Sequence, residues 1–205
     1  MDPHQQVEQL NGLEALDPLV AALDQRVPEV FRSGPVRDAL AGNAIGHALH
    51  PMLTDLPIGT WTSATLLDLL GPRRWRGASA TLTGIGLLAS VPTVASGWVE
   101  WGETPTSQRR VAAVHAASNG MAAGCYLVSF LAKLRGRTST ARNAALLGAV
   151  VLGVGGYLGG HLSLGRGVGV GDRSASSTTI DLTDTSSPGA GHPDLASDPT
   201  GGPPT

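Results

Sequence analysis

Three histidines that could bind a metal or a haem lie near the ends of long uncharged segments: His50, His115 and His161. Imidazole can ligate a metal or a haem iron, and it can carry a proton near neutral pH. An ionisable side chain inside or beside an apolar span is costly to place, so it is a functional-site candidate by default. Each histidine could also lie at the membrane interface, hydrogen-bonded to water or to a helix cap.

Other polar residues near these histidines could orient them or exchange protons with them. Asn119 follows His115 by one helical turn, and Tyr157 precedes His161 by one turn. Such a neighbour can hold an imidazole in one tautomer. Asp55 and Glu100 could do the same or accept a proton. The expected cofactor site therefore comprises His50, His115, His161, Asp55, Glu100, Asn119 and Tyr157, with the three histidines as candidate metal ligands.

Four apolar segments must position these residues. Three of them have a stretch without Asp, Glu, Lys or Arg, at residues 77–99, 111–132 and 143–165, and a fourth is apolar apart from Asp55 and Asp68. Each reaches the ~20 residues that a helix needs to cross a bilayer. The predicted spans are Pro51–Leu70, Gly77–Val99, Arg109–Leu134 and Ala141–Leu164. A soluble helical bundle is the competing interpretation, but it should show a charged stripe along each helix.

The predicted fold is an all-α integral membrane bundle of four transmembrane helices with short loops. Residues 1–46 form a polar segment, with short amphipathic helices expected at Gly12–Val27 and Pro35–Leu40. Residues 47–170 form the transmembrane domain. Residues 171–205 are rich in Ser, Thr, Asp, Gly and Pro, and this composition predicts a disordered tail.

Loop charges predict the orientation of the spans. The first and third loops carry seven Lys or Arg residues, whereas the second has only Arg109 and Arg110. The positive-inside rule therefore places loops one and three in the cytoplasm and both termini outside. This topology brings the three histidines and Glu100 to the extracytoplasmic face. Asp68 falls at the other end, where we expect an ion pair with Arg73 or Arg74. The four tryptophans fit the aromatic belts of the two interfaces.

Several classes of function find no support in the sequence. The net charge of −2, without a basic patch interleaved with aromatic residues, argues against a nucleic-acid partner. The single cysteine, Cys125, cannot form an internal disulfide or a cysteine-based zinc site. No nucleophile–base pair, phosphate loop or metalloprotease motif is present, so we assign no enzymatic activity.

Scattered motifs resemble an uncharacterised bacterial four-helix membrane family, domain of unknown function 2231, over about residues 40–172. They are Gly46-His47-Ala48-Leu49-His50-Pro51, Thr54-Asp55-Leu56-Pro57-Ile58-Gly59, Ser96-Gly97-Trp98, Arg109-Arg110 before His115-Ala116, Tyr157-Leu158-Gly159-Gly160-His161-Leu162 and Gly167-Val168-Gly169-Val170. The resemblance implies a multi-pass protein of the bacterial inner membrane. Some relatives carry a C-terminal Rieske iron–sulfur domain, which implies a redox setting with haem or quinone. This chain departs from them, because one cysteine cannot build that centre.

The leading expectation is a redox-associated membrane module. Two of the three histidines would bind a b-type haem or support a quinone near the extracytoplasmic face, with Asp55 and Glu100 handling protons. A separate redox protein would then be its partner, besides the lipid bilayer. Two alternatives stay open: a structural anchor or assembly subunit without chemistry, and a divalent-metal-binding or transport protein. The identity of the cofactor and homo-oligomerisation also stay open.

Overall fold

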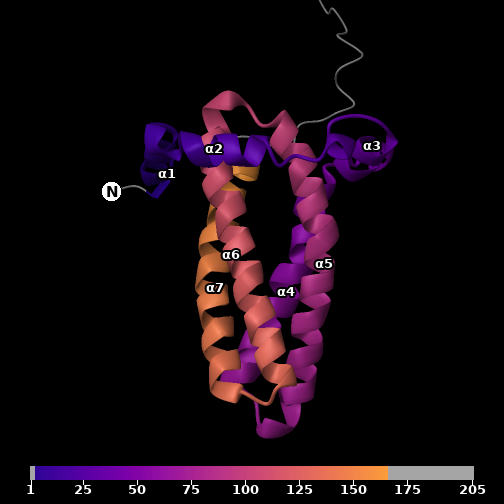
Figure 1. The fold of residues 1–205 in the computed structure, drawn as a ribbon, viewed down its shortest axis with the longest axis vertical. Coiled ribbons are helices and arrows are strands. Elements are labelled where there is room, and N and C mark those ends of the chain that lie inside the picture. Colours follow the sequence, from indigo (N-terminus) through magenta and orange to yellow (C-terminus); the bar gives the residue numbers. More distant parts are fainter. Residues whose placement is uncertain (1–2, 166–205) are drawn as a thin grey trace, which may run out of the picture. The chain divides into compact units, whose positions relative to one another are not determined.

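The computed structural model describes residues 3–165, and all regular secondary structure within them is helical. Four long helices run side by side as a bundle: α4 (Leu49–Leu70), α5 (Arg76–Glu103), α6 (Arg109–Leu134) and α7 (Thr138–Gly160) (Figure 1). The predicted all-α class is confirmed, and α6 has the predicted bounds. The expected disordered tail at 171–205 lies outside the described residues.

Three of the four long helices meet the requirements of length and composition for crossing a membrane. With their adjoining turns they cover Arg73–Glu103, Thr106–Leu134 and Thr138–Leu164. The prediction of four spans is thus supported for α5, α6 and α7 only. Helix α4 carries Asp55 and Asp68, which lower its hydropathy, although its 22 residues reach roughly 33 Å at 1.5 Å per residue.

The bundle consists of two helical hairpins. Helix α4 packs along α5 and α6 packs along α7, whereas contacts between the two pairs are sparser. Gly71 ends α4 and is followed by Pro72 and a short 3₁₀ helix, η4 (Arg73–Trp75). Gly136 makes the turn between α6 and α7 with a φ of +69°, a conformation that favours glycine. The 3₁₀ helix η5 (Thr106–Gln108) joins the hairpins.

Equivalent residues of the two hairpins meet one another along the bundle. Positions 50 and 115, 61 and 126, and 68 and 133 all differ by the same 65 residues. The His50 and His115 ring centroids are 6.3 Å apart, and Trp61 stacks on Tyr126 with centroids 4.6 Å apart. At the third level Lys133 Nζ lies 2.8 Å from Asp68 Oδ2. A residue contacts its own equivalent only on a two-fold axis, so the hairpins are related by an approximate two-fold axis along the bundle.

These contacts correct two expectations. The partner of Asp68 is Lys133, and not Arg73 or Arg74, because Lys133 lies in the last turn of α6 and points into the bundle. Both side chains are nearly buried, and Lys133 Nζ also donates to Ser79 and Thr83. Trp61 is not an interfacial anchor, since only 3% of it is exposed between the hairpins.

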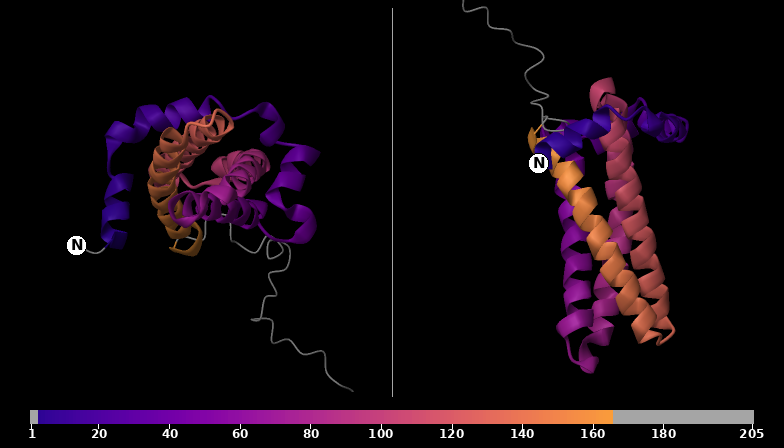
Figure 2. Two further views of the ribbon diagram at one scale, coloured as in Figure 1. Left: turned by 90° about the horizontal axis from the view of Figure 1, so that it is seen from below. Right: turned by 90° about the vertical axis from the view of Figure 1, so that its left-hand side faces the viewer.

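A segment that we call the N-terminal collar, residues 3–45, wraps around the end of the bundle where α4 and α6 begin (Figure 1; Figure 2, left). It contains α1 (Pro3–Asn11), α2 (Asp17–Asp24) and α3 (Pro35–Ala41). The single helix predicted at Gly12–Val27 is therefore wrong at its start, because α1 ends before Gly12 and α2 begins only at Asp17. Val7 and Leu23 pack against a cluster that includes Trp101.

Ionic contacts fasten the collar to the bundle end. The Arg110 guanidinium donates to both carboxylate oxygens of Asp17, at 2.7 and 2.9 Å. These hydrogen bonds hold the pKa of the Asp17 carboxyl below its usual value. Asp24 accepts from the indole N–H of Trp101 at 2.8 Å and pairs with Arg109. Further along the collar, Arg37 pairs with Glu103.

Candidate functional site

His50 is fixed in one orientation by the backbone of the neighbouring helix. It lies in the first turn of α4, and its Nδ1 is 2.8 Å from the carbonyl oxygen of Thr93 on α5. Because a carbonyl only accepts, Nδ1 carries the proton and Nε2 keeps its lone pair. Gly97, one turn after Thr93, lies against the ring, and a Cβ there would be 3.0 Å from Cε1 of His50.

His115 repeats this arrangement in the second hairpin. Its Nδ1 is 2.8 Å from the carbonyl oxygen of Gly155 on α7, so it also donates through Nδ1. Gly159, again one turn later, lies against the ring, and a Cβ there would be 2.7 Å from Cε1 of His115. Asn119 donates to the backbone carbonyl of His115 at 3.0 Å, and its amide nitrogen lies 3.1 Å from Nε2. Both imidazoles therefore have a defined tautomer and an Nε2 that can accept or ligate.

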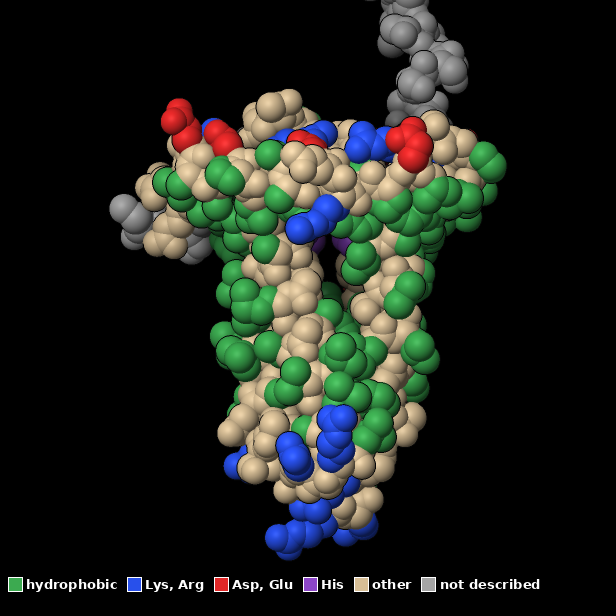
Figure 3. Space-filling model, in the orientation of Figure 1, with side chains coloured by type: hydrophobic (Ala, Val, Ile, Leu, Met, Phe, Trp, Pro, Cys, Tyr) green, Lys and Arg blue, Asp and Glu red, His purple; other side chains and the backbone are tan. Residues whose placement is uncertain are grey.

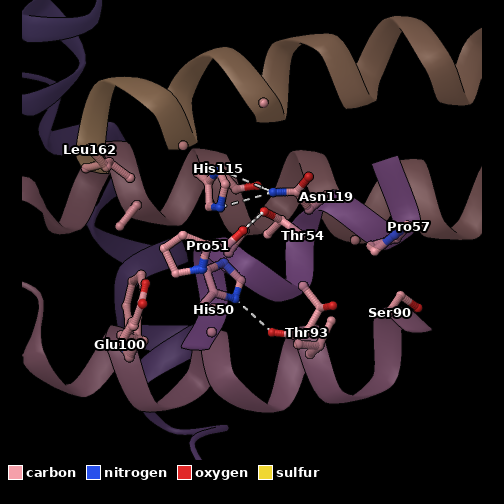
Figure 4. A pocket seen from close by; sticks show the side chains of 18 of the residues that line it. His50, Pro51, Thr54, Pro57, Ser90, Thr93, Glu100, His115, Asn119 and Leu162 are labelled. Carbon is pink, nitrogen blue, oxygen red and sulfur yellow. Dashed lines mark hydrogen bonds between the residues drawn. The ribbon is translucent and has the colours of Figure 1, made fainter. Parts of the chain in front are cut away.

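The two histidines line one cavity between the hairpins. Their ring planes are 83° apart, and the cavity has a volume of about 390 Å³. Its walls are mostly apolar, with Trp61 toward the middle of the bundle and Leu23 of the collar at the near end. Figure 4 shows His50, His115 and Asn119 around this space. On the side between α5 and α6 the surface is hollowed, and histidine side chains are visible inside (Figure 3).

The structure assembles only part of the expected site. Glu100 and Asn119 line the cavity together with His50 and His115. His161 does not line it. That ring is buried, and its Nε2 lies 3.0 Å from Glu8 Oε1 on α1.

Two further candidates lie on the outside of the bundle. Asp55 is exposed on α4, and 46% of Tyr157 is exposed on α7. Neither residue lines the cavity. The expected metal set of three histidines is not brought together either. Among the described residues, no three His, Cys, Asp or Glu side chains lie close enough to hold a metal ion.

Sequence reasoning missed the residues that hold the histidines in place. Thr93 and Gly155 act through backbone carbonyls, which carry no side-chain signal. Gly97 and Gly159 act by having no side chain. The sequence did contain one signal of these residues, which is their spacing. Position 155 follows position 93 by 62 residues, and position 159 follows position 97 by the same number. Combined with the spacing of the two histidines, this regularity indicates a repeated hairpin.

A family model described as "Predicted membrane protein (DUF2231)" matches residues 46–172. The matched region includes the whole of α4 to α7 and therefore all the cavity residues except Leu23 of the collar. No curated protein and no solved structure matches the chain.

Proposed function

From the premise that the chain belongs to this family of predicted membrane proteins, we propose that it is a redox-associated membrane module that holds a b-type haem between His50 and His115. The observation that carries the proposal is the pair of imidazoles on α4 and α6. Each is fixed by its Nδ1–H to a carbonyl, and both line one apolar cavity. Facing helices of a bundle commonly supply such ligand pairs.

The number of ligands favours a haem over a bare metal ion. Structural zinc takes four protein ligands and catalytic zinc three, whereas a haem, whose porphyrin supplies four nitrogens to the iron, would need only one or two protein ligands, and His50 and His115 would provide them. The ring centroids of His50 and His115 are 6.3 Å apart, so one bound group could contact both imidazoles.

The cavity also suits a flat apolar group. Its volume of about 390 Å³ lies within the ~300–1,000 Å³ typical of small-molecule sites. Glycines, and not bulky side chains, stand beside both imidazoles. Carbonyl partners on Nδ1 raise the basicity of Nε2 and fix the ring orientation. Ligation by His115 requires Asn119 to give up its contact with Nε2.

When bound, a haem supplies one-electron transfer, and the protein sets its potential through the axial ligands and the polarity of the pocket. The described residues hold the group and limit access of water. Leu23 and Trp101 cover the cavity beneath the collar. Glu100 projects into the cavity from α5 (Figure 4) and offers a carboxylate for proton exchange.

In the proposed topology, α4 is a fourth span and the arginine-rich loops lie in the cytoplasm. Both termini and the haem site are then near the extracytoplasmic face of the bacterial inner membrane. Electrons would pass to or from a separate redox protein, because this chain has one cysteine and cannot build an iron–sulfur centre.

A second candidate is a quinone in the same cavity. The opening between α5 and α6 favours it, because a lipid-soluble molecule could enter there from the bilayer (Figure 3). The Nε2 atoms of His50 and His115, which keep their lone pairs, could then accept hydrogen bonds from the hydroxyl groups of the reduced quinol, with Glu100 as a further proton acceptor.

The test is an absorption spectrum of the full chain purified in detergent from haem-replete cells. We expect a Soret band that shifts on reduction, and its loss or a change of its position in His50→Ala and in His115→Ala. His161→Ala is the matched control and should keep the spectrum, because His161 faces Glu8. Absence of a Soret band excludes the haem proposal. Solvent extraction of the same sample then tests for quinone.

A further inference from the structure

The collar exposes apolar side chains along much of its length. Leu13, Val30, Val36 and Ile45 are between 43% and 52% exposed. They come from α3, from the short helices around it and from the turn after α1, so they are distributed over the whole collar. Together they form what we call the collar rim.

Apolar and charged groups are segregated on this end of the molecule. In Figure 3, hydrophobic side chains gather along the edge of the collar that faces the length of the bundle, while the acidic side chains lie along the opposite edge. On α4, which contacts α3 of the collar, Met52 and Leu56 are also 57% and 54% exposed. Exposed apolar side chains are thus present both on the collar and on the neighbouring helix of the bundle.

We propose that the collar lies in the membrane interface, with the collar rim inserted at the boundary between the headgroups and acyl chains of the same bilayer that the bundle crosses. Amphipathic helices bind in this way, with the apolar face ~5–10 Å below the headgroups and the charged face in water. The collar helices cross the direction of the bundle helices (Figure 1). Helices that lie across the spans are parallel to the plane of a bilayer.

A lipid surface suits the rim better than a second protein does. The collar that carries its four residues follows the perimeter of the bundle on several sides (Figure 2, left). A single partner would bury one contiguous patch, whereas lipid surrounds the protein. Glu29 and Arg32, which flank Val30 on the collar, form an ion pair with side chains that are 87% and 50% exposed, so these charges can remain hydrated.

This placement has a consequence for the cavity. His50 lies in the first turn of α4 and His115 in the second turn of α6, at the end of the bundle that the collar encloses. With the collar in the interface, the opening between α5 and α6 lies at the edge of the hydrocarbon layer. A ligand would then reach the cavity from the bilayer and not through the collar.

The inference is tested by spin-label accessibility in the full chain, reconstituted into phosphatidylethanolamine–phosphatidylglycerol nanodiscs. Cys125 is replaced by Ala, with Ser as a second background in case the first does not fold. Single cysteines are introduced as Val30→Cys, Val36→Cys and, as the matched control beside Val30, Glu29→Cys. Relaxation is then measured with oxygen, which concentrates in lipid, and with a water-soluble nickel chelate.

We expect oxygen to dominate at positions 30 and 36 and the nickel chelate to dominate at position 29. Equal exposure of all three labels to the nickel chelate overturns the proposal, because the rim would then lie in water. Protection of positions 30 and 36 from both reagents also overturns it and indicates a second copy or another protein on the rim. None of these outcomes depends on whether the cavity binds haem.

Discussion

At the scale of single residues, the candidate site depends on two glycines, which have no side chain, as much as on the histidines. Gly97 and Gly159 leave the space that the two imidazoles occupy, and the carbonyls of Thr93 and Gly155 fix the rings. The sequence could identify His50 and His115, because an imidazole near an apolar span is costly. It could not identify the carbonyl acceptors, because every residue has one.

Asp55 and Tyr157 were predicted as site residues from their spacing to a histidine on the same helix, but neither lines the cavity. Asp55 follows His50 by five residues, which at 3.6 residues per turn points about 140° away around α4. Thr54, four residues on, is the one that lines the cavity. Tyr157 is one turn before His161, but 46% of it is exposed, whereas His161 is buried with its Nε2 3.0 Å from Glu8.

The role of Gly159 can be tested by adding one methyl group. In Gly159→Ala the new Cβ would lie 2.7 Å from Cε1 of His115, so the ring must turn and its bond to Gly155 weakens. We expect haem retention, measured as the ratio of Soret to protein absorbance, to fall several-fold. Overpacking of this kind costs ~1–3 kcal/mol, so the folded bundle should persist.

The matched control is Gly153→Ala on the same helix, where the added Cβ meets nothing within 4 Å. It should retain haem as the unmodified chain does. Equal retention in both variants would mean that the space beside His115 is not needed for the ligand.

At the scale of elements, the two hairpins share their spacing and only some residue types, such as His50 with His115 and Gly97 with Gly159. Trp61 corresponds to Tyr126, and Asp68 to Lys133. The first helices of the hairpins are offset by 65 residues, as at positions 50 and 115. The second helices are offset by 62, as at positions 97 and 159. One fixed period therefore aligns only one helix of each hairpin with its equivalent, so the repeat is hard to see in the sequence. The helix lengths and the all-α class, in contrast, follow from the uncharged runs alone.

The buried pair Asp68–Lys133 should hold the two hairpins together at the end away from the histidines. Leaving one buried charge without its partner costs ~3–5 kcal/mol. We therefore expect Asp68→Lys and Lys133→Asp each to lower the melting temperature in detergent strongly. The double exchange should recover most of the loss, because opposite charges again face each other.

Arg135→Ala serves as the control, since this exposed residue lies at the same end of the bundle and its replacement should be nearly neutral. If the doubly exchanged variant is no more stable than the single variants, Lys133 stabilises the bundle through its hydrogen bonds to Ser79 and Thr83 and not through its charge pair with Asp68.

Attachment of the collar should weaken in acid. The pKa of Asp17 is lowered in the folded protein by its hydrogen bonds to Arg110. A carboxyl with a depressed pKa stabilises the fold above its ordinary pKa of 3.8 and loses that effect as pH falls through the lower, folded value. A spin label at Ala21→Cys on α2, with Cys125 replaced, should therefore become more mobile below about pH 4.

Asp17→Asn removes the titrating group and should make label mobility at position 21 much less dependent on pH in this range. Added salt should act in the same direction as acid, because the pair is solvent-exposed. Equal acid sensitivity in both proteins would assign the change to another contact, such as Asp24 with Arg109.

At the scale of the whole molecule, the number of spans decides which side each loop occupies. Helix α4 falls short of the hydropathy expected of a span because it carries the exposed Asp55 and the inward-facing Asp68. If α4 spans, the collar and the η4 turn lie on opposite sides of the membrane. With three spans, they lie on the same side.

Cysteine accessibility in spheroplasts separates these topologies. With Cys125 replaced, single cysteines are introduced as Ser33→Cys in the collar, Arg74→Cys, Thr106→Cys and Arg137→Cys, and the cells are treated with a membrane-impermeant maleimide. We expect positions 33 and 106 to react from outside, and positions 74 and 137 only after permeabilisation, because arginine-rich loops stay in the cytoplasm. Reaction of 33 and 74 from the same side would show that α4 does not cross. The histidine cavity would then have one wall that is not a transmembrane helix.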